Sequence, residues 1–165
     1  MIPPRQEIVI CFAHAAYQMK ACFDALNTGI GNFELREPDG LEQRAREADV
    51  IVVSGMWHNG LIPLATRLRF IQSIGSGTDQ FDKAVLAARG VRLASAAGVN
   101  ARAVSEHAMA LILALGRRLP EARDNQARRV WRGMIGDLTQ REDELTGKTV
   151  LILSLIHISE PTRPY

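Results

Sequence analysis

A short segment with two glycines, G-S-G-T-D at residues 75–79, is the clearest candidate for ligand chemistry in this sequence. It follows an apolar run at residues 70–74 that has the length of a buried strand. Open parallel sheets bind ligands at the carboxyl ends of their strands. Because Gly75 and Gly77 lack side chains, backbone N–H groups there are open to an anion such as a carboxylate. The same residues also fit a tight turn in which Asp79 caps the loop.

Two other places carry groups that could contact a ligand. Asn100 precedes a long helical pattern, and the free N–H groups at a helix start attract a carboxylate or an amide. A plain N-cap is the alternative for Asn100. The segment Met56-Trp57-His58-Asn59 follows a strand and could line a pocket, although a tryptophan at a strand end often serves packing alone.

Other polar groups do not form a recognisable catalytic or metal site. Glu106 and His107 are neighbours in a helical pattern, so their side chains point in different directions, and we expect His107 to be buried or to cap. Residues 75–80 are not a dinucleotide fingerprint, because Gln80 stands where the third glycine belongs. Zinc-ligand spacing is absent from the other candidates, which are Cys11, His14, Cys22 and His58.

Composition describes an ordinary globular protein. The chain has 165 residues, 47% hydrophobic and 23% charged, which is enough for a core of domain size. Its 20 basic and 18 acidic residues give a net charge of +2, which predicts neither nucleic acid nor a membrane as partner. We expect Cys11 and Cys22 to be buried thiols in a reducing compartment. No signal peptide or spanning segment is evident, so the sequence predicts a cytoplasmic protein.

Strands and helices alternate through the first part of the chain. The expected strands are residues 7–13, 33–35, 49–55, 70–74 and 91–94, and the expected helices are residues 15–26, 41–48, 61–68 and 82–89. This alternation predicts an α/β fold with right-handed crossovers: a flavodoxin-like, doubly wound parallel sheet with helices on both faces. Residues 75–79 would then lie at the carboxyl end of the fourth strand.

A long helical pattern follows the predicted sheet. From Asn100 to Trp131 the apolar residues step by three or four, which predicts one long helix or two nearly collinear ones, kinked or restarted at Pro120. A polar loop then leads to an apolar run, Thr149 to Ile152, that is typical of the first strand of a new domain. We therefore expect a substrate domain at 1–99, an inter-domain helix at 100–131, and at 132–152 a linker with the first strand of a truncated nucleotide-binding domain.

Three segments and one tryptophan resemble the D-isomer-specific 2-hydroxyacid dehydrogenases: LRFIQSIGSGTDQFD (68–82), GVRLASAAGVNARAVSEHAMALILALGRRLP (90–120), LTGKTVLI (145–152) and Trp131. The resemblance implies a substrate or catalytic domain, followed by an inserted nucleotide-binding domain. It implies that the backbone amides of Ser76 and Gly77 hold the substrate carboxylate, and that Asn100 lies at the edge between substrate and nicotinamide. It further implies NAD or NADP as the hydride carrier, a small 2-oxoacid or 2-hydroxyacid as the substrate, and a homodimer.

The residues that such an enzyme needs for turnover have no counterpart here. The resemblance places the cofactor fingerprint and the catalytic arginine, glutamate and histidine after the strand at 149–152. We therefore expect no catalytic and no cofactor-binding residue in this chain, and we expect a fragment that is inactive and binds no cofactor. Residues 153–165 resemble a translated sequencing adapter and are expected to be non-native; a natural disordered terminus is the alternative.

Two functions of different class follow from these observations. In the first, the chain is the truncated substrate domain of an NAD(P)-dependent oxidoreductase that acts on D-2-hydroxy acids. In the second, it is a complete, non-catalytic α/β module whose exposed helix docks a partner. The first predicts a reading frame that continues into G-x-G-x-x-G, and the second predicts a genuine stop after Tyr165.

Overall fold

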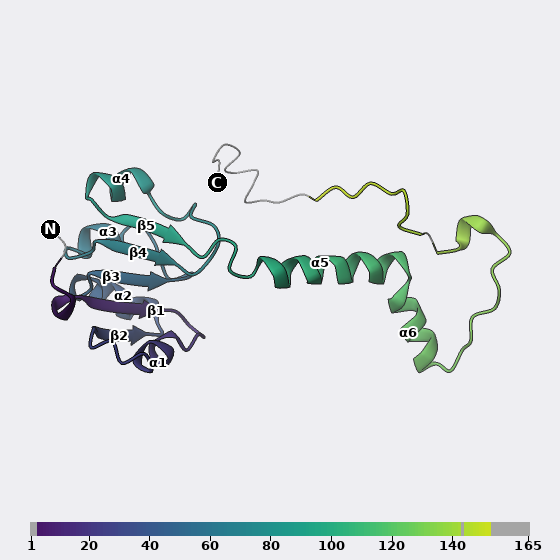
Figure 1. Cartoon of the computed structure of the whole chain (residues 1–165), viewed down its shortest axis with the longest axis horizontal. Coiled ribbons are helices and arrows are strands. Elements are labelled where there is room, and N and C mark those ends of the chain that lie inside the picture. Colours follow the sequence, from purple (N-terminus) through teal and green to yellow (C-terminus); the bar gives the residue numbers. More distant parts are fainter. Residues whose placement is uncertain (1–2, 143, 153–165) are drawn as a thin grey trace. The chain divides into compact units, whose positions relative to one another are not determined.

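The chain forms two compact units, Met1–Val99 and Asn100–Tyr165. A computed structural model describes residues 3–142 and 144–152 (Figure 1). The expected non-native segment, residues 153–165, lies outside the described residues.

The first unit alternates strands and helices, as the sequence predicts. Its elements are η1 (Arg5–Glu7), β1 (Val9–Ala13), α1 (Met19–Asp24), β2 (Gly31–Leu35), α2 (Pro38–Arg44), η2 (Ala45–Glu47), β3 (Val50–Val53), α3 (Leu61–Leu64), β4 (Phe70–Ser73), α4 (Lys83–Ala88) and β5 (Arg92–Ser95). All strand pairings are parallel, and the five-stranded sheet has the order β2-β1-β3-β4-β5. This is the order of flavodoxin-like doubly wound folds, so the predicted fold class is confirmed.

Helix α1 starts later than its sequence pattern predicts, at Met19 rather than at residue 15. The imidazole of His14 explains the delay, because its Nδ1 accepts a hydrogen bond of 3.0 Å from the backbone N–H of Tyr17. This bond closes a turn over residues 14–17, and the helix begins only after it.

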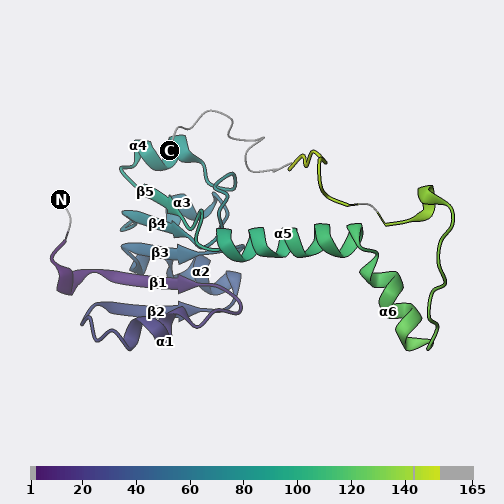
Figure 2. The same ribbon diagram turned by 45° about the vertical axis from the view of Figure 1, so that its right-hand side comes forward.

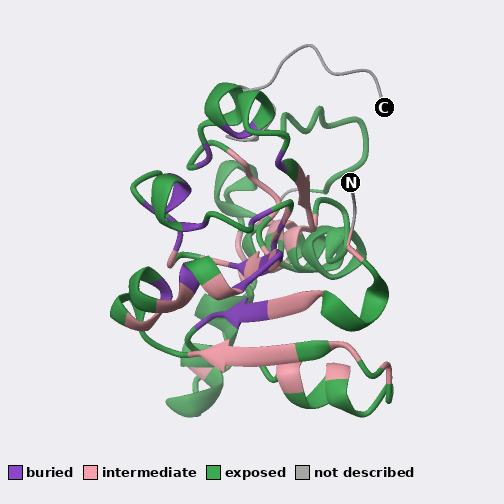
Figure 3. Cartoon of the chain, turned by 90° about the vertical axis from the view of Figure 1, so that its left-hand side faces the viewer, coloured by how far each residue is buried: buried purple, intermediate pink, exposed green. Residues whose placement is uncertain are grey.

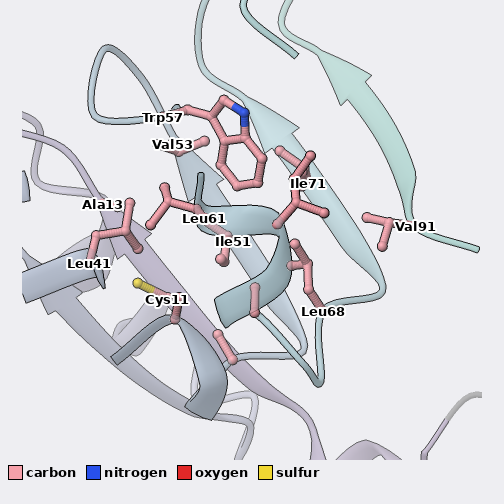
Figure 4. Close-up of a cluster of buried hydrophobic side chains, with 14 of the residues drawn as sticks. Cys11, Ala13, Leu41, Ile51, Val53, Trp57, Leu61, Leu68, Ile71 and Val91 are labelled. Atoms are coloured by element: carbon pink, nitrogen blue, oxygen red, sulfur yellow. The ribbon is translucent and has the colours of Figure 1, made fainter. Parts of the chain in front are cut away.

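The core lies between one face of the sheet and helices α2, α3 and α4. Figure 4 shows the part of it in which Leu41 and Leu61 lie beside Ile51. Alternate strand residues such as Cys11, Ile51 and Ile71 are fully buried on that face, where leucines from the helices meet them. These leucines are Leu41, Leu61 and Leu86. Burying one such side chain contributes roughly 1.5–3 kcal/mol. Phe12 points to the opposite face, where its ring lies 5.5 Å from that of Phe23 in α1, so helices cover both faces.

Both cysteines are free, but only one is buried. Burial raises the pKa of Cys11 to about 12 and keeps it a thiol. The expectation of a second buried thiol is wrong, because Cys22 lies in α1, a helix with no buried residue.

The second unit contains α5 (Ala101–Gly116), α6 (Leu119–Ala127) and η3 (Leu138–Gln140). The helix is interrupted just before Pro120, at Arg118, whose φ of 49° is left-handed, and α6 then leaves along a different direction (Figures 1 and 2). The two helices that form, α5 and α6, are therefore not collinear. Pro120 is tolerated because it lies in the first turn of α6, where its missing N–H has no partner to lose.

Every residue of helix α5 is exposed or half-buried. In the first unit, by contrast, buried residues lie along the strands of the sheet (Figure 3). Helix α5 has no buried residue, and leucines such as Leu111 and Leu115 are exposed. Within the described ranges, none of the helices combines the length and apolar character that crossing a membrane requires.

The strand predicted at Thr149–Ile152 does not form. These residues have no regular secondary structure, and Val150, Leu151 and Ile152 are exposed. A strand needs a neighbouring strand to satisfy its backbone groups, and the described part of the chain offers none beside this segment. The prediction of a strand at these residues is wrong for this chain.

Candidate functional site

The segment 75–79 lies directly after β4, at the carboxyl edge of the sheet. Ser76 and Gly77 are half-buried there. The neighbouring connection from β5, at Ala96, contacts the same loop from the side.

Two hydrogen-bond donors hold the backbone of the loop. The backbone N–H of Ala96 donates to the carbonyl oxygens of Ser73 (3.0 Å) and Gly75 (3.2 Å). The buried hydroxyl of Ser73 donates to the carbonyl oxygens of Gly75 (3.3 Å) and Gly77 (3.5 Å). In a planar trans peptide the N–H points opposite to the C=O, so the Ser76 N–H is directed away from these donors.

No strained backbone conformation requires the two glycines of this loop. Neither Gly75 nor Gly77 has a left-handed φ. A Cβ atom built on Gly75 would lie 3.8 Å from Ser73 Oγ, and one on Gly77 would lie 3.9 Å from Asp79 Oδ2, both ordinary contacts. A methyl group would therefore fit the fold, and what the glycines provide is open access to the backbone of the loop.

The far end of the loop is anchored to the loop after β3. The Trp57 ring is buried and packs against Phe81, with 5.2 Å between ring centroids. Asn59 Oδ1 accepts hydrogen bonds from Trp57 Nε1 (3.2 Å) and from the backbone N–H of Asp82 (2.9 Å). Asp82 in turn caps α4 through the N–H of Val85. The N-cap of α4 beside the loop is thus Asp82.

The other two members of the predicted 56–59 segment are less constrained. Met56 is half-buried, and the exposed His58 pairs through Nε2 with Glu42 Oε1 of α2 at 3.0 Å. Of this segment, Trp57 and Asn59 hold the two loops together, and Met56 is half-buried and packs against the core.

Asn100 stands at the N-cap position of α5 and is exposed. Its carbonyl accepts the N–H of Val104, but its side chain makes no capping hydrogen bond. The plain side-chain cap that the sequence offered as an alternative is therefore not made.

His14 is a buried titratable group that the sequence pattern did not single out as such. It follows β1, and its Nε2 lies 3.1 Å from Glu34 Oε1, while Glu34 also pairs with Arg36 at 2.9 Å. Burial lowers the pKa of His14 below its usual value, and the carboxylate of Glu34 partly opposes this. A histidine directly after an apolar strand was the available signal. His107, expected to be buried or capping, is exposed.

The described residues do not suggest a metal or dinucleotide site. No three of their His, Cys, Asp and Glu side chains gather as metal ligands. Residues 149–152 are not a strand, and no glycine follows Gly147 in the sequence, so a glycine-rich turn after a strand is not available here. The nicotinamide cofactor is therefore not assigned to residues of this chain.

Comparison with known protein families shows which family this chain belongs to. The family model described as D-isomer specific 2-hydroxyacid dehydrogenase, catalytic domain, matches residues 10–156. The chain belongs to this family. Family relatives include D-3-phosphoglycerate dehydrogenase of Mycobacterium bovis, 30% identical over 124 residues, covering 74% of this chain and 23% of the relative. Erythronate-4-phosphate dehydrogenase of Shewanella sediminis is 36% identical over 78 residues, covering 46% of this chain and 20% of the relative.

Solved structures share the fold of this chain. The D-lactate dehydrogenase of Aquifex aeolicus, crystallised with NAD and lactic acid, superimposes with a TM-score of 0.67 at 20% identity, covering 82% of this chain and 41% of that one. At this identity the similarity shows the fold alone. The chain spans less than a quarter of the length of these curated dehydrogenases and under half of the length of this structure.

Proposed function

We propose that this chain is the substrate-binding part of an NAD(P)-dependent oxidoreductase that acts on the CH–OH group of small D-2-hydroxy acids. Ser76 and Gly77 present backbone N–H groups to the carboxylate of the substrate. The observation that carries the proposal is the orientation of the Gly75–Ser76 peptide, whose carbonyl accepts hydrogen bonds from the Ser73 hydroxyl and the Ala96 N–H. The Ser76 N–H, directed away from these two donors at a strand's carboxyl end, suits a small anion.

Asn100 contributes a polar side chain at the edge between substrate and nicotinamide. Its amide is exposed and is not used to cap α5, which leaves it available for a ligand. The nicotinamide supplies the hydride when it is bound, and this chain contributes binding and orientation of the acid. The Aquifex aeolicus relative is described with NAD and lactic acid, which supports NAD or NADP and a 2-hydroxyacid as the ligands here.

We also place the whole protein in the cytoplasm as a homodimer. The exposed leucines of α5 support an assembled state, because apolar surface of this kind is normally covered. The alternative is a non-catalytic interaction module that docks a partner through the same helix. It does not account for the match to a family of dehydrogenases.

Carboxylate binding is tested by titrating the ¹⁵N-labelled chain with D-lactate and following its backbone amide signals. We expect the Ser76 and Gly77 amides to shift in a saturable way. D-Lactamide is the matched control ligand, since it keeps the shape but has no charge, and it should leave these signals in place. Equal shifts with both ligands, or none with D-lactate, would contradict the proposal.

Gly77→Ala separates binding from folding. The added methyl has room in the fold, so the free energy of unfolding should stay within about 1 kcal/mol of the parent. The methyl narrows the approach to the loop, so we expect the Kd for D-lactate to rise roughly tenfold or more. Gly55→Ala is the control, because a Cβ there meets nothing within 4 Å, and it should change neither quantity.

Turnover by the isolated chain is the second test. We expect purified residues 1–165 to show no reduction of glyoxylate or hydroxypyruvate with NADH or NADPH, followed by nicotinamide absorbance. Measurable, enzyme-dependent oxidation of either cofactor would show that residues of this chain suffice for catalysis.

A further inference from the structure

We propose that Ser73 is a positioning residue for the substrate carboxylate: its buried hydroxyl orients the Gly75–Ser76 peptide so that the Ser76 N–H faces the ligand. This inference rests on the proposed function. Ser73 itself does not touch the substrate.

The position of Ser73 is unusual for a polar residue. It ends β4 on the face that carries the core, where the same strand contributes Ile71 and the neighbouring strand contributes Val53. All three side chains are fully buried. A hydroxyl there costs free energy unless it is hydrogen-bonded, and the bonds it makes are both to the loop. The hydroxyl is thus committed to residues 75–77.

The geometry of the bonds explains the effect on Ser76. The Gly75 carbonyl receives two donors, the Ala96 N–H and the Ser73 hydroxyl. The Ala96 N–H is shared with the Ser73 carbonyl, and the single hydroxyl hydrogen of Ser73 is shared with the Gly77 carbonyl, so each donor alone holds Gly75 only in part. The hydroxyl supplies the second constraint, and with both in place the peptide plane is fixed, because its C=O and N–H are antiparallel. The bond to Gly77, at 3.5 Å, is the weaker of the two hydroxyl contacts.

Three variants isolate this role. Ser73→Ala removes the hydroxyl, and Ser73→Thr keeps it. Ser95→Ala is the matched control: Ser95 is the register partner of Ser73 on β5, and its hydroxyl oxygen accepts the N–H of Ala97 rather than contacting the loop. Each variant is prepared in the full 165-residue chain with ¹⁵N label.

The ligand measurement is the Kd for D-lactate, from amide shifts. Losing one preorganising hydrogen bond is expected to raise the Kd roughly tenfold in Ser73→Ala. Ser73→Thr and Ser95→Ala should stay within about twofold of the parent. The proposal is overturned if Ser73→Ala binds like the parent, if Ser95→Ala loses as much affinity, or if Ser73→Thr is as weak as Ser73→Ala.

A second measurement uses no ligand and separates this inference from the proposed function. In free Ser73→Ala, the heteronuclear NOE of the Ser76 amide should fall and its hydrogen exchange should change, while Ser95→Ala leaves both unaltered. If the parent binds no D-lactate but this loop response is present, the proposed function fails and Ser73 still orients the loop. An unchanged Ser76 amide overturns the inference whatever the ligand does.

Ser73→Cys covers the case in which the alanine variant does not fold. The thiol fills a similar space and is a weak donor, so the Kd should rise by an intermediate factor, roughly threefold. A parent-like Kd together with a parent-like Ser76 amide in Ser73→Cys would overturn the proposal.

Discussion

Helices α4 and α5 both carry leucines, but the two units use them differently. Leu86 of α4 is 1% exposed in the core of the first unit, whereas Leu115 of α5 is 73% exposed. A helix satisfies its backbone through bonds within its own segment, so α5 forms even where its side chains are not buried. In the first unit, secondary structure and burial support each other; in the second, α5 and α6 form without any buried residue.

The contrast is sharper for two apolar runs of similar composition. Val50–Val53 forms β3, with β1 and β4 on either side. The segment 149–152 contains equally strand-prone residues and remains irregular. A strand obtains its hydrogen bonds from other segments, so composition alone does not make one.

The largest expected effect comes from placing proline in each run. Val52→Pro removes a backbone donor from the central strand and should abolish the folded first unit, while Val150→Pro should change its unfolding free energy by less than about 0.5 kcal/mol. Urea unfolding followed by Trp57 fluorescence is the measurement, in a Trp131→Phe background, since Trp57 is 6% and Trp131 97% exposed. Strong destabilisation by Val150→Pro would mean that residues 149–152 are paired in solution.

Leucine truncation tests the comparison between the helices. Leu86→Ala leaves a cavity under the sheet and should cost about 3 kcal/mol of unfolding free energy. Leu115→Ala, the same change on an exposed helix surface, should cost less than about 0.5 kcal/mol in the same assay. Similar losses for both variants would show that α5 is covered in solution.

The smallest effect concerns pH. Burial lowers the pKa of His14 below 6.5, so between that lowered value and 6.5 the unfolded chain binds more protons than the folded one. Stability should therefore fall as the pH drops below about 6.5 and level off above it. His14→Gln should flatten this slope relative to the parent, and His107→Gln, on exposed α5, should leave it unchanged. A parent-like slope in His14→Gln would rule out His14 as its source.

The sequence could predict the sheet because its signals are local and repeated. β-Branched runs such as residues 50–53, closed by polar or glycine residues, define strands, and their alternation with helices leaves few topologies. The same signals placed residues 75–79 at the carboxyl edge of the sheet. The break at Arg118 could be expected from Pro120, but the direction of α6 could not, since one left-handed residue decides it.

The supports of the candidate site could not be predicted from the sequence. Ser73 looks like an ordinary strand residue, and only the fold brings its hydroxyl under Gly75. The Ala96 N–H has no sequence signature at all, because every residue but proline carries one. The sequence marks Asn59 only as part of a polar loop, because its link to Asp82 depends on two loops meeting in space.

Asn59 also limits how this site can diversify. One oxygen atom receives a donor from the loop after β3 and another from the start of α4, so replacing Asn59 disturbs both loops together. A new substrate specificity would therefore arise with the least loss of stability through substitutions at neighbours of Asn59 that take no part in these two hydrogen bonds. Met56 and His58 are the two such positions in this loop. Homologues with different substrates should therefore differ at these two residues, while Trp57 and Asn59 vary together.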